Sequence, residues 1–276
     1  MDKSVNFFRS AAGRLLVVGF LLGSLGGCSE RTPSFFADFS QHKPLRLSEW
    51  GLFELDEQRL APLPNLEVVR PANPLFTDYA HKLRTLWIPT GAQAKLVDGE
   101  IDYPVGSILS KTFYYPTDSQ GRVIKMRDSG ASDISLVDSR LLETRLLVRQ
   151  ADGWAALPYV WNEDETEAFL RVAGASYALT MVDADQAAAP PTQFAYFVPN
   201  ENQCSGCHTT KHPDGGMHPL GAIASQLTAS AHAKDGEFRP QVETLVARGW
   251  LDRAPEQAAI AAYDDPSEPL ETRAMA

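Results

Sequence analysis

The sequence predicts an α+β fold, in which a mainly antiparallel β-domain is followed by a CxxCH motif and a short helical tail. Three observations predict it. Short segments rich in aliphatic and aromatic residues alternate with turn-forming residues between about residues 83 and 200. One motif, Cys204-Ser205-Gly206-Cys207-His208, follows that region. Beyond the motif the composition becomes rich in alanine, which favours helices.

The first 27 residues are expected to be a lipoprotein signal peptide. Lys3, Arg9 and Arg14 form a basic start, and an apolar run from Leu15 to Leu25 follows. The run is shorter than the about 20 residues that a membrane-spanning helix needs, and it has the length of a signal-peptide core. It ends in Leu-Gly-Gly-Cys28, which resembles the lipobox where bacterial lipoproteins are cleaved and lipidated. An ordinary signal peptide with an incidental cysteine is the alternative.

Lipidation of Cys28 predicts a periplasmic protein that is anchored to a membrane. Ser29 follows the cysteine, and the absence of Asp there favours the outer membrane in a host with two membranes. The chain has a net charge of −10, and loss of residues 1–27 removes three basic residues and one acidic residue, which gives −10 − 2 = −12. This acidity argues against nucleic acid as a partner and favours a redox partner with a basic patch.

Residues 28–64 are expected to be a lipid-anchored tether and linker, with a short helix around residues 48–53, because the segment starts polar and contains four prolines. Residues 65–200 are expected to form the β-rich domain. The turn formers Asp152-Gly153 predict a hairpin between the flanking strands. The strand candidates are Thr85–Pro89, Ser107–Tyr115, Leu141–Arg149, Trp154–Trp161, Ala168–Ala173 and Phe194–Val198.

Residues 201–276 are expected to hold the motif and the helical tail. The predicted helices are Leu220–Ala233, Pro240–Arg248 and Pro255–Ala262.

The motif has the pattern of a c-type haem attachment site. Two cysteine thiols separated by two residues can add to the two haem vinyl groups, and the histidine that follows can bind the iron as an axial ligand. Cys204 and Cys207 are therefore the expected thioether residues and His208 the expected iron ligand, with one haem c as the cofactor. The chain has only three cysteines, so if Cys28 is lipidated this pair has no other cysteine to bond with.

Two other interpretations of the cysteine pair stay open. A thioredoxin-like pair requires a βαβ context and a helix N-terminus that lowers the thiol pKa, and no such unit precedes Cys204. A structural zinc site could use Cys204 and Cys207 with two of His208, His212 and His218.

The sixth iron ligand is less determined. The path around the macrocycle is roughly 25 to 30 Å, whereas an extended chain covers at most about 3.3–3.6 Å per residue. His212 is therefore too near His208 to bind the same iron. Met217 and His218 can reach only with a nearly straight chain, although glycines and a proline before them predict a turn. His232 has enough slack. His42 and His81 are distant in sequence and are expected to be surface or core polar residues, Met275 lies at a frayed terminus, and an empty position is the remaining alternative.

The chain resembles the exported, largely uncharacterised bacterial diheme c-type cytochromes that have a β-rich region before their haem motifs. The resemblance covers most of residues 45–272 and implies haem binding and electron transfer. In those relatives a stretch like Pro266–Arg273 leads into a second CxxCH, whereas this chain stops at Ala276, so a mono-haem or truncated version is expected. The similar blocks are Leu75–Ala80, Tyr103–Gly106, Lys111–Pro116, Glu143–Arg149, Gly153-Trp154, Tyr159–Asn162 and Val198–Cys204.

A β-domain followed by a C-terminal CxxCH is also similar to mono-haem cytochromes that oxidise hydroxylamine or bind nitric oxide. Two functions are therefore expected: electron transfer without catalysis, or an open-site haem protein that acts on a small nitrogen compound or gas. Whether the protein is an enzyme stays open at this point. Arg145 and Arg149 alternate with apolar residues, so they lie on one side of a strand, where they face solvent or pair with the haem propionates.

Overall fold

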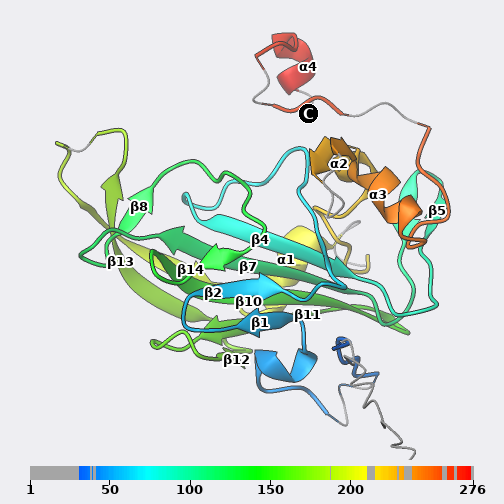
Figure 1. Ribbon diagram of the computed structural model, residues 1–276, viewed down its shortest axis with the longest axis horizontal. Helices are drawn as coiled ribbons and strands as arrows, with labels where there is room; N and C mark the ends of the chain where they lie inside the picture. Colours follow the sequence, from blue (N-terminus) through cyan, green and yellow to red (C-terminus); the bar gives the residue numbers. More distant parts are fainter. Residues whose placement is uncertain are drawn as a thin grey trace, which may run out of the picture. The chain divides into compact units, whose positions relative to one another are not determined.

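The main sheet of the protein has six strands, each antiparallel to its neighbours, in the order β12-β11-β10-β7-β4-β3 (Figure 1). The computed structural model describes residues 31–37, 39, 42–186, 188–209, 215–228, 230–232, 238–256, 260–263 and 266–274. In this order the strands are β12 (Ala168–Leu170), β11 (Gly153–Trp161), β10 (Ser139–Gln150), β7 (Ile108–Pro116), β4 (His81–Trp87) and β3 (Glu67–Val68).

The strand predictions between residues 81 and 198 are confirmed, as is the hairpin. β10 and β11 pair from Glu143↔Val160 to Gln150↔Gly153, with the turn at residues 151 and 152. Buried residues alternate with half-buried ones over His81–Thr85 of β4 and Thr144–Gln150 of β10, so one side of each strand faces the core. The predicted β-rich domain is therefore mostly antiparallel.

Four groups of shorter strands in the described part of the chain were not predicted, apart from β14. The sheet β1-β2-β9 contains Phe53–Leu55, Arg59–Pro62 and Ile134–Ser135, and the sheet β14-β13-β8 contains Thr192–Val198, Ala175–Asp183 and Val123–Lys125. Two hairpins are β5 (Lys95–Val97) with β6 (Glu100–Asp102), and β15 (Ser230–His232) with β16 (Phe238–Pro240).

The helical elements are short. They are the 3₁₀ helix η1 (Leu47–Trp50) and the α-helices α1 (Glu201–His208), α2 (Ala224–Leu227), α3 (Gln241–Ala247) and α4 (Leu270–Ala274). Within the part of the chain described, no helix has the length and apolarity needed to cross a membrane.

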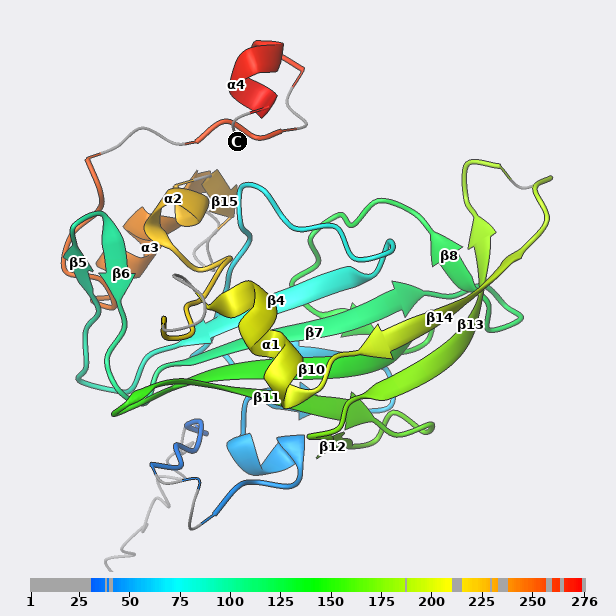
Figure 2. The same cartoon turned by 180° about the vertical axis from the view of Figure 1, so that it is seen from behind.

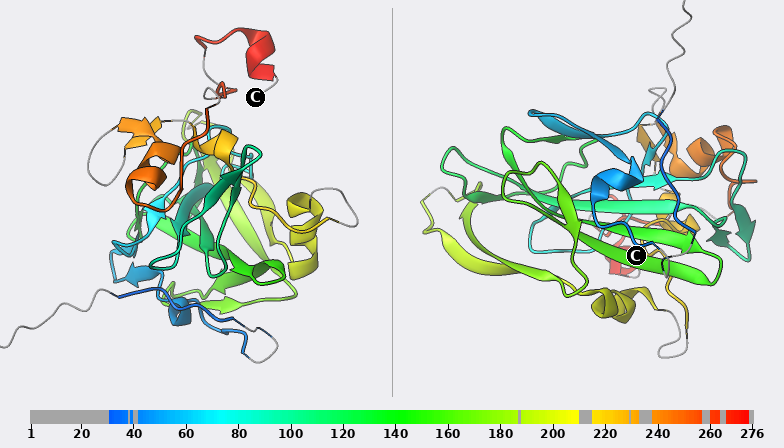
Figure 3. Two further views of the ribbon diagram at one scale, coloured as in Figure 1. Left: turned by 90° about the vertical axis from the view of Figure 1, so that its right-hand side faces the viewer. Right: turned by 90° about the horizontal axis from the view of Figure 1, so that it is seen from below.

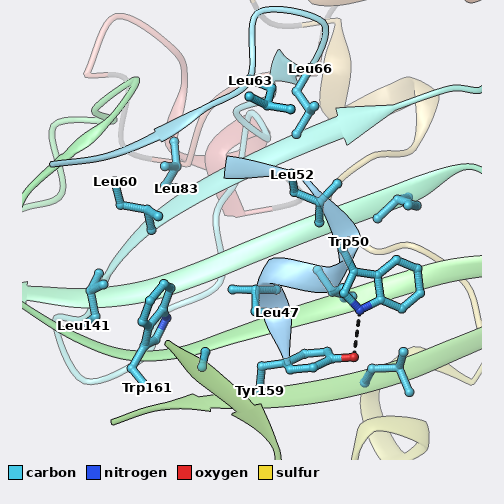
Figure 4. Packing of buried hydrophobic residues seen from close by; sticks show 14 of the residues in the cluster. Leu47, Trp50, Leu52, Leu60, Leu63, Leu66, Leu83, Leu141, Tyr159 and Trp161 are labelled. Atoms are coloured by element: carbon cyan, nitrogen blue, oxygen red, sulfur yellow. Dashed lines mark hydrogen bonds between the residues drawn. The ribbon is translucent and has the colours of Figure 1, made fainter. Parts of the chain in front are cut away.

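One face of the main sheet packs against residues 47–63, which lie in the segment expected to be tether and linker. Trp50 and Leu60 are completely buried there. The Trp50 indole N–H donates to the Tyr159 hydroxyl at 2.8 Å, and that hydroxyl donates to the Pro44 carbonyl at 2.9 Å (Figure 4). A buried aromatic pair with satisfied polar atoms fixes this segment on the sheet. The segment is thus part of the core as well as a connection.

The opposite face of the sheet has apolar clusters at both ends and carries α1. At one end Leu86 and Leu109 pack against α2 and α3, and at the other Phe113 and Leu142 pack against β13 and β14. Figure 2 shows α1 over this face, and the left panel of Figure 3 shows α1 and β1 on opposite sides of the main sheet. The middle of the face, between the two clusters, is where the candidate site lies.

The predicted helical tail is only partly correct. α3 confirms the helix expected at 240–248. Of the helix expected at 220–233, only α2 forms, and Ser230–His232 is a strand paired with β16. The described residues of 255–262 are not helical. Alanine content favours helices only weakly, and segments this short depend on tertiary contacts, which here favour a hairpin after α2.

Candidate haem site

Helix α1 begins at a capping box directly after β14. The Gln203 N–H donates to the Asn200 side-chain oxygen, and the Asn200 N–H donates to the Gln203 side-chain oxygen, both at 2.9 Å. This reciprocal pair satisfies two backbone donors at the start of the helix. The Asn-x-x-Gln pattern is visible in the sequence, although the helix itself was not predicted.

The helix places the three residues of the motif on one side. Cys204, Cys207 and His208 are separated by three and four positions, the spacing of neighbours on a helix surface. All three line one cavity. Neither cysteine is in a disulfide bond, and Cys204 is buried whereas Cys207 is exposed. The predicted site residues are therefore brought together.

The His208 ring is held from one side. Its Nδ1 lies 2.7 Å from the carbonyl oxygen of His218, and the His218 N–H donates to the His208 carbonyl at 2.7 Å. Burial lowers the pKa of His208, the nearby charges of Lys111 and Arg145 add to this, and the bond to His218 opposes it. A neutral imidazole whose Nδ1–H is donated to a carbonyl keeps Nε2 as a free acceptor, which is the arrangement of a metal-binding histidine.

The cavity has a volume of about 290 Å³ and opens to solvent on one side. This is close to the lower end of the roughly 300–1000 Å³ that ligand sites have. One wall is α1, another is the exposed middle of the main sheet, and the loops 71–77 and 220–221 contribute the rest. Its apolar lining includes Pro71, Leu75, Phe76, Phe113, Leu147, Ala156 and Leu220. Such a lining can cover a flat apolar ring.

The polar part of the lining is basic. Lys82, Arg84, Lys111 and Arg145 all face the cavity from β4, β7 and β10. Burial lowers the pKa of Lys82 to about 8 and that of Arg84 to about 10. Burial also lowers the pKa of Lys111 to about 7, and the neighbouring cations Arg84, Arg145 and Lys82 contribute. Burial and mutual repulsion therefore both disfavour the charged forms of these basic side chains.

Arg145 has a buried acidic partner. Its guanidinium donates to both carboxylate oxygens of Glu143, at 2.7 and 2.6 Å, and the Tyr196 hydroxyl donates to the same carboxylate at 2.6 Å. Glu143 is completely buried. Of the two arginines considered from the sequence, Arg145 faces the cavity, whereas Arg149 lies outside its lining and donates to the Gln150 carbonyl.

Sequence reasoning missed Lys82, Arg84 and Lys111. Each lies on the same side of its strand as the buried apolar residues at the two ends of this face. Because side chains alternate between the two sides of a strand, the sequences of β4 and β7 already show which residues share a side. Only the strand register brings the three side chains together, and the register was not predicted.

Of the candidates for the sixth ligand, Met217 and His218 are described, and neither lines the cavity. Met217 bridges to Thr209 next to the motif, and the backbone of His218 is bonded to His208. His232 lies in β15, and its side chain is outside the described part, as are Cys28, His212 and Met275. His81 lies on the other face of the sheet, where its Nε2 contacts the Met126 carbonyl at 3.3 Å.

A metal site of the zinc type requires converging ligands. Among the residues that the structure describes, no three His, Cys, Asp or Glu side chains converge to hold a metal ion. His212, one of the ligands considered for zinc, lies outside this part of the chain.

Comparisons with protein-family models, with curated proteins and with solved structures found no match for this chain.

Proposed function

We propose that this protein is an exported c-type cytochrome that binds one covalent haem and transfers electrons. The observation that carries the proposal is the placement of Cys204, Cys207 and His208 on one side of α1, facing a cavity that has apolar and basic walls. The residues fit the group, because haem c is attached through two cysteine thiols and its iron is bound by a neutral imidazole. Neither cysteine is in a disulfide bond.

The roles of the chain's residues follow from their positions. Cys204 and Cys207 would form the thioethers, and Nε2 of His208 would bind the iron while the His218 carbonyl holds the ring. Phe76, Phe113 and the other apolar residues would limit access of water to the ring. Haem supplies a one-electron iron couple, whose potential depends on ligands and burial. Basic residues near the ring favour the reduced form, because reduction removes a positive charge.

The test is covalent haem in protein made by a host that matures c-type cytochromes. Wild-type protein is expected to show a haem-stained band after denaturation. Changing Cys204 to Ala should leave a single thioether and strongly lower the yield of holoprotein, whereas changing Ser205, between the two cysteines, to Ala should leave the yield unchanged. A wild-type band without haem stain would disprove the proposal.

A second candidate function is an open-site haem protein that binds or oxidises a small nitrogen compound or gas. One observation favours it: among the described residues that line the cavity, His208 is the one histidine, and methionine does not occur. The His218 carbonyl accepts from the Nδ1 side of the His208 ring, and His218 does not line the cavity.

Ferrous holoprotein with carbon monoxide separates the two candidates. Rapid binding and a shifted absorption band are expected for an open iron, and an unchanged spectrum is expected for an iron with two strong protein ligands. The second result would exclude the open-site function and leave electron transfer.

Membrane anchoring through Cys28 belongs to the same proposal. The intact mass of the mature protein is expected to correspond to a chain that begins at a lipid-modified Cys28. A Cys28→Ala variant should stay with the soluble fraction or keep its signal peptide. Wild-type protein that is unlipidated and soluble would contradict this part.

A further inference from the structure

Three basic residues form a row across the middle of the main sheet. In the strand register Arg84 of β4 lies opposite Lys111 of β7, and Lys111 lies opposite Arg145 of β10. Side chains directly opposite each other in an antiparallel pair have Cβ atoms about 4.5–5.5 Å apart. All three side chains line the cavity, and each is half-buried. We call Arg84, Lys111 and Arg145 the cation row.

The cation row is short of negative charge. Glu143 pairs with Arg145 and is fully buried beside it. Within the described part of the chain, neither the Lys111 amine nor the Arg84 guanidinium makes a hydrogen bond or an ion pair; Lys111 lies 5.7 Å from the Phe113 ring centre, and Asp128 acts on Arg84 only from a distance. Asp128 also faces Lys82, whose charge offsets it. When Lys111 is protonated, three cations and one carboxylate leave 3 − 1 = 2 positive charges; because its pKa is about 7, this full count applies below about pH 7.

Such a row is unfavourable by itself. Like charges directly opposite each other destabilise a sheet, and partial burial removes the water that would screen them. Lys111 is the centre of the row, and its lowered pKa has the same two causes, burial and neighbouring cations. A ligand with two negative charges would neutralise the excess, and a carboxylate matches an arginine or a lysine in hydrogen bonding.

The row and the cysteine motif line the same cavity: Cys204 and Cys207 lie on α1, and the three cations lie on the main sheet. In haem the two propionates lie on the edge of the ring opposite the two vinyl groups. We propose that the cation row binds a pair of carboxylates, namely the two propionates of the haem attached at Cys204 and Cys207. This inference rests on the proposed function and names the residues that hold the polar edge of the cofactor.

The test uses Lys111→Gln and Arg84→Gln in holoprotein whose thioether linkage has been confirmed by haem stain. Arg149→Gln is the matched control, because Arg149 lies on the same side of β10 as Arg145, about 13 Å along the strand. Infrared difference spectra with labelled propionate carboxyl groups report on the propionates directly. Both variants are expected to shift the carboxylate bands and lower the midpoint potential, and the control should change neither.

Thermal unfolding supplies an independent readout that does not depend on the iron. In haem-free protein, Lys111→Gln relieves repulsion within the row and is expected to raise Tm. In holoprotein the same change removes a partner of a propionate and is expected to lower Tm. Lys111→Arg keeps the charge and should load haem with nearly wild-type carboxylate bands, so a folding defect of Lys111→Gln would not end the test.

Several results would overturn the inference. Unchanged carboxylate bands in both variants, or the same sign of the Tm change with and without haem, would show that the row does not bind the propionates. Sulfate binding to wild-type holoprotein that is lost in Lys111→Gln would show that the row takes a free anion instead. Failure to attach haem at all would count against the proposed function and is seen at the first step.

Discussion

At the scale of single residues, the most informative contact is the hydrogen bond at His208. The carbonyl of His218 accepts from Nδ1 of the His208 ring, and the backbone N–H of His218 donates to the His208 carbonyl. The side chain of His218 takes no part in either contact. The ten-residue separation that made His218 a candidate ligand therefore has a different use, which is to bring a carbonyl to the back of the imidazole ring.

Replacing His218 with Ala should leave the iron environment unchanged, because Ala keeps the backbone carbonyl and N–H that hold His208. The ferrous absorption spectrum of His218→Ala holoprotein is expected to match that of the wild type. His208→Gly removes the proposed axial ligand of the iron and should change the spectrum, with partial recovery in added imidazole. A spectrum of His218→Ala that resembled that of His208→Gly would show that the His218 side chain binds the iron.

Glu165 predicts a pH dependence of stability. It lies in the turn between β11 and β12 and accepts the Leu141 N–H at 3.1 Å. Burial raises the pKa of Glu165 from 4.5 to about 7, although the Leu141 bond and Arg140 oppose the shift. The folded protein therefore holds this proton more tightly than the unfolded chain, and the free energy of unfolding falls as pH rises from about 4.5 to above 7.

The Glu165→Gln variant removes this titration and keeps an acceptor for Leu141. It should be more stable than the wild type by roughly 1 kcal/mol at pH 8, allowing for partial exposure, and equal to it near pH 4. Urea unfolding at both pH values measures the difference. Glu163→Gln, an exposed site in the same turn, is the control. A variant less stable than the wild type at pH 8 would contradict the prediction.

At the scale of elements, α1 is positioned by its junction with the β14-β13-β8 sheet. Gly174 lies next to this junction with φ 75°, and a Cβ there would meet the Val198 carbonyl and the Asn200 N–H. The close approach of residue 174 and the capping box of Asn200 together fix where the helix begins. The cysteines lie in the next turn, so their place in the cavity wall depends on this start.

Asn200→Ala should loosen α1 without changing the motif. Loss of the cap is expected to cost about 1 kcal/mol, which should increase the amide exchange rate of Gln203 about fivefold. Holoprotein yield should fall as well, because the thiols are less often held in the cavity wall. Asn202→Ala, at an exposed position within α1, is the control. Equal exchange rates in the two variants would show that the cap does not hold the helix.

At the scale of the whole molecule, the sequence predicted the parts whose signal is local. Segments rich in aliphatic and aromatic residues, separated by turn formers, identified six strands. The CxxCH motif identified the three site residues that α1 brings together. The cation row could not be predicted, because it depends on which strands pair and in what register. The segment 47–63 was expected to be a linker because its prolines are local signals for irregular structure, whereas its burial depends on the distant Tyr159 and Trp161.

The burial of residues 47–63 leads to a prediction about truncation. Leu47, Trp50, Leu52, Leu60 and Leu63 are each no more than 3% exposed. Burying each such side chain contributes about 1.5–3 kcal/mol, so the five contribute about 10 kcal/mol, similar to the whole stability of a domain at about 5–15 kcal/mol. A chain that begins at Arg31 keeps them all and should unfold cooperatively, with nearly the stability of the mature protein. A chain that begins at Asn65 should lack a cooperative transition by circular dichroism and should bind apolar dyes. Cooperative unfolding of the shorter chain would show that the main sheet is stable without this covering, and that residues 47–63 are a linker after all.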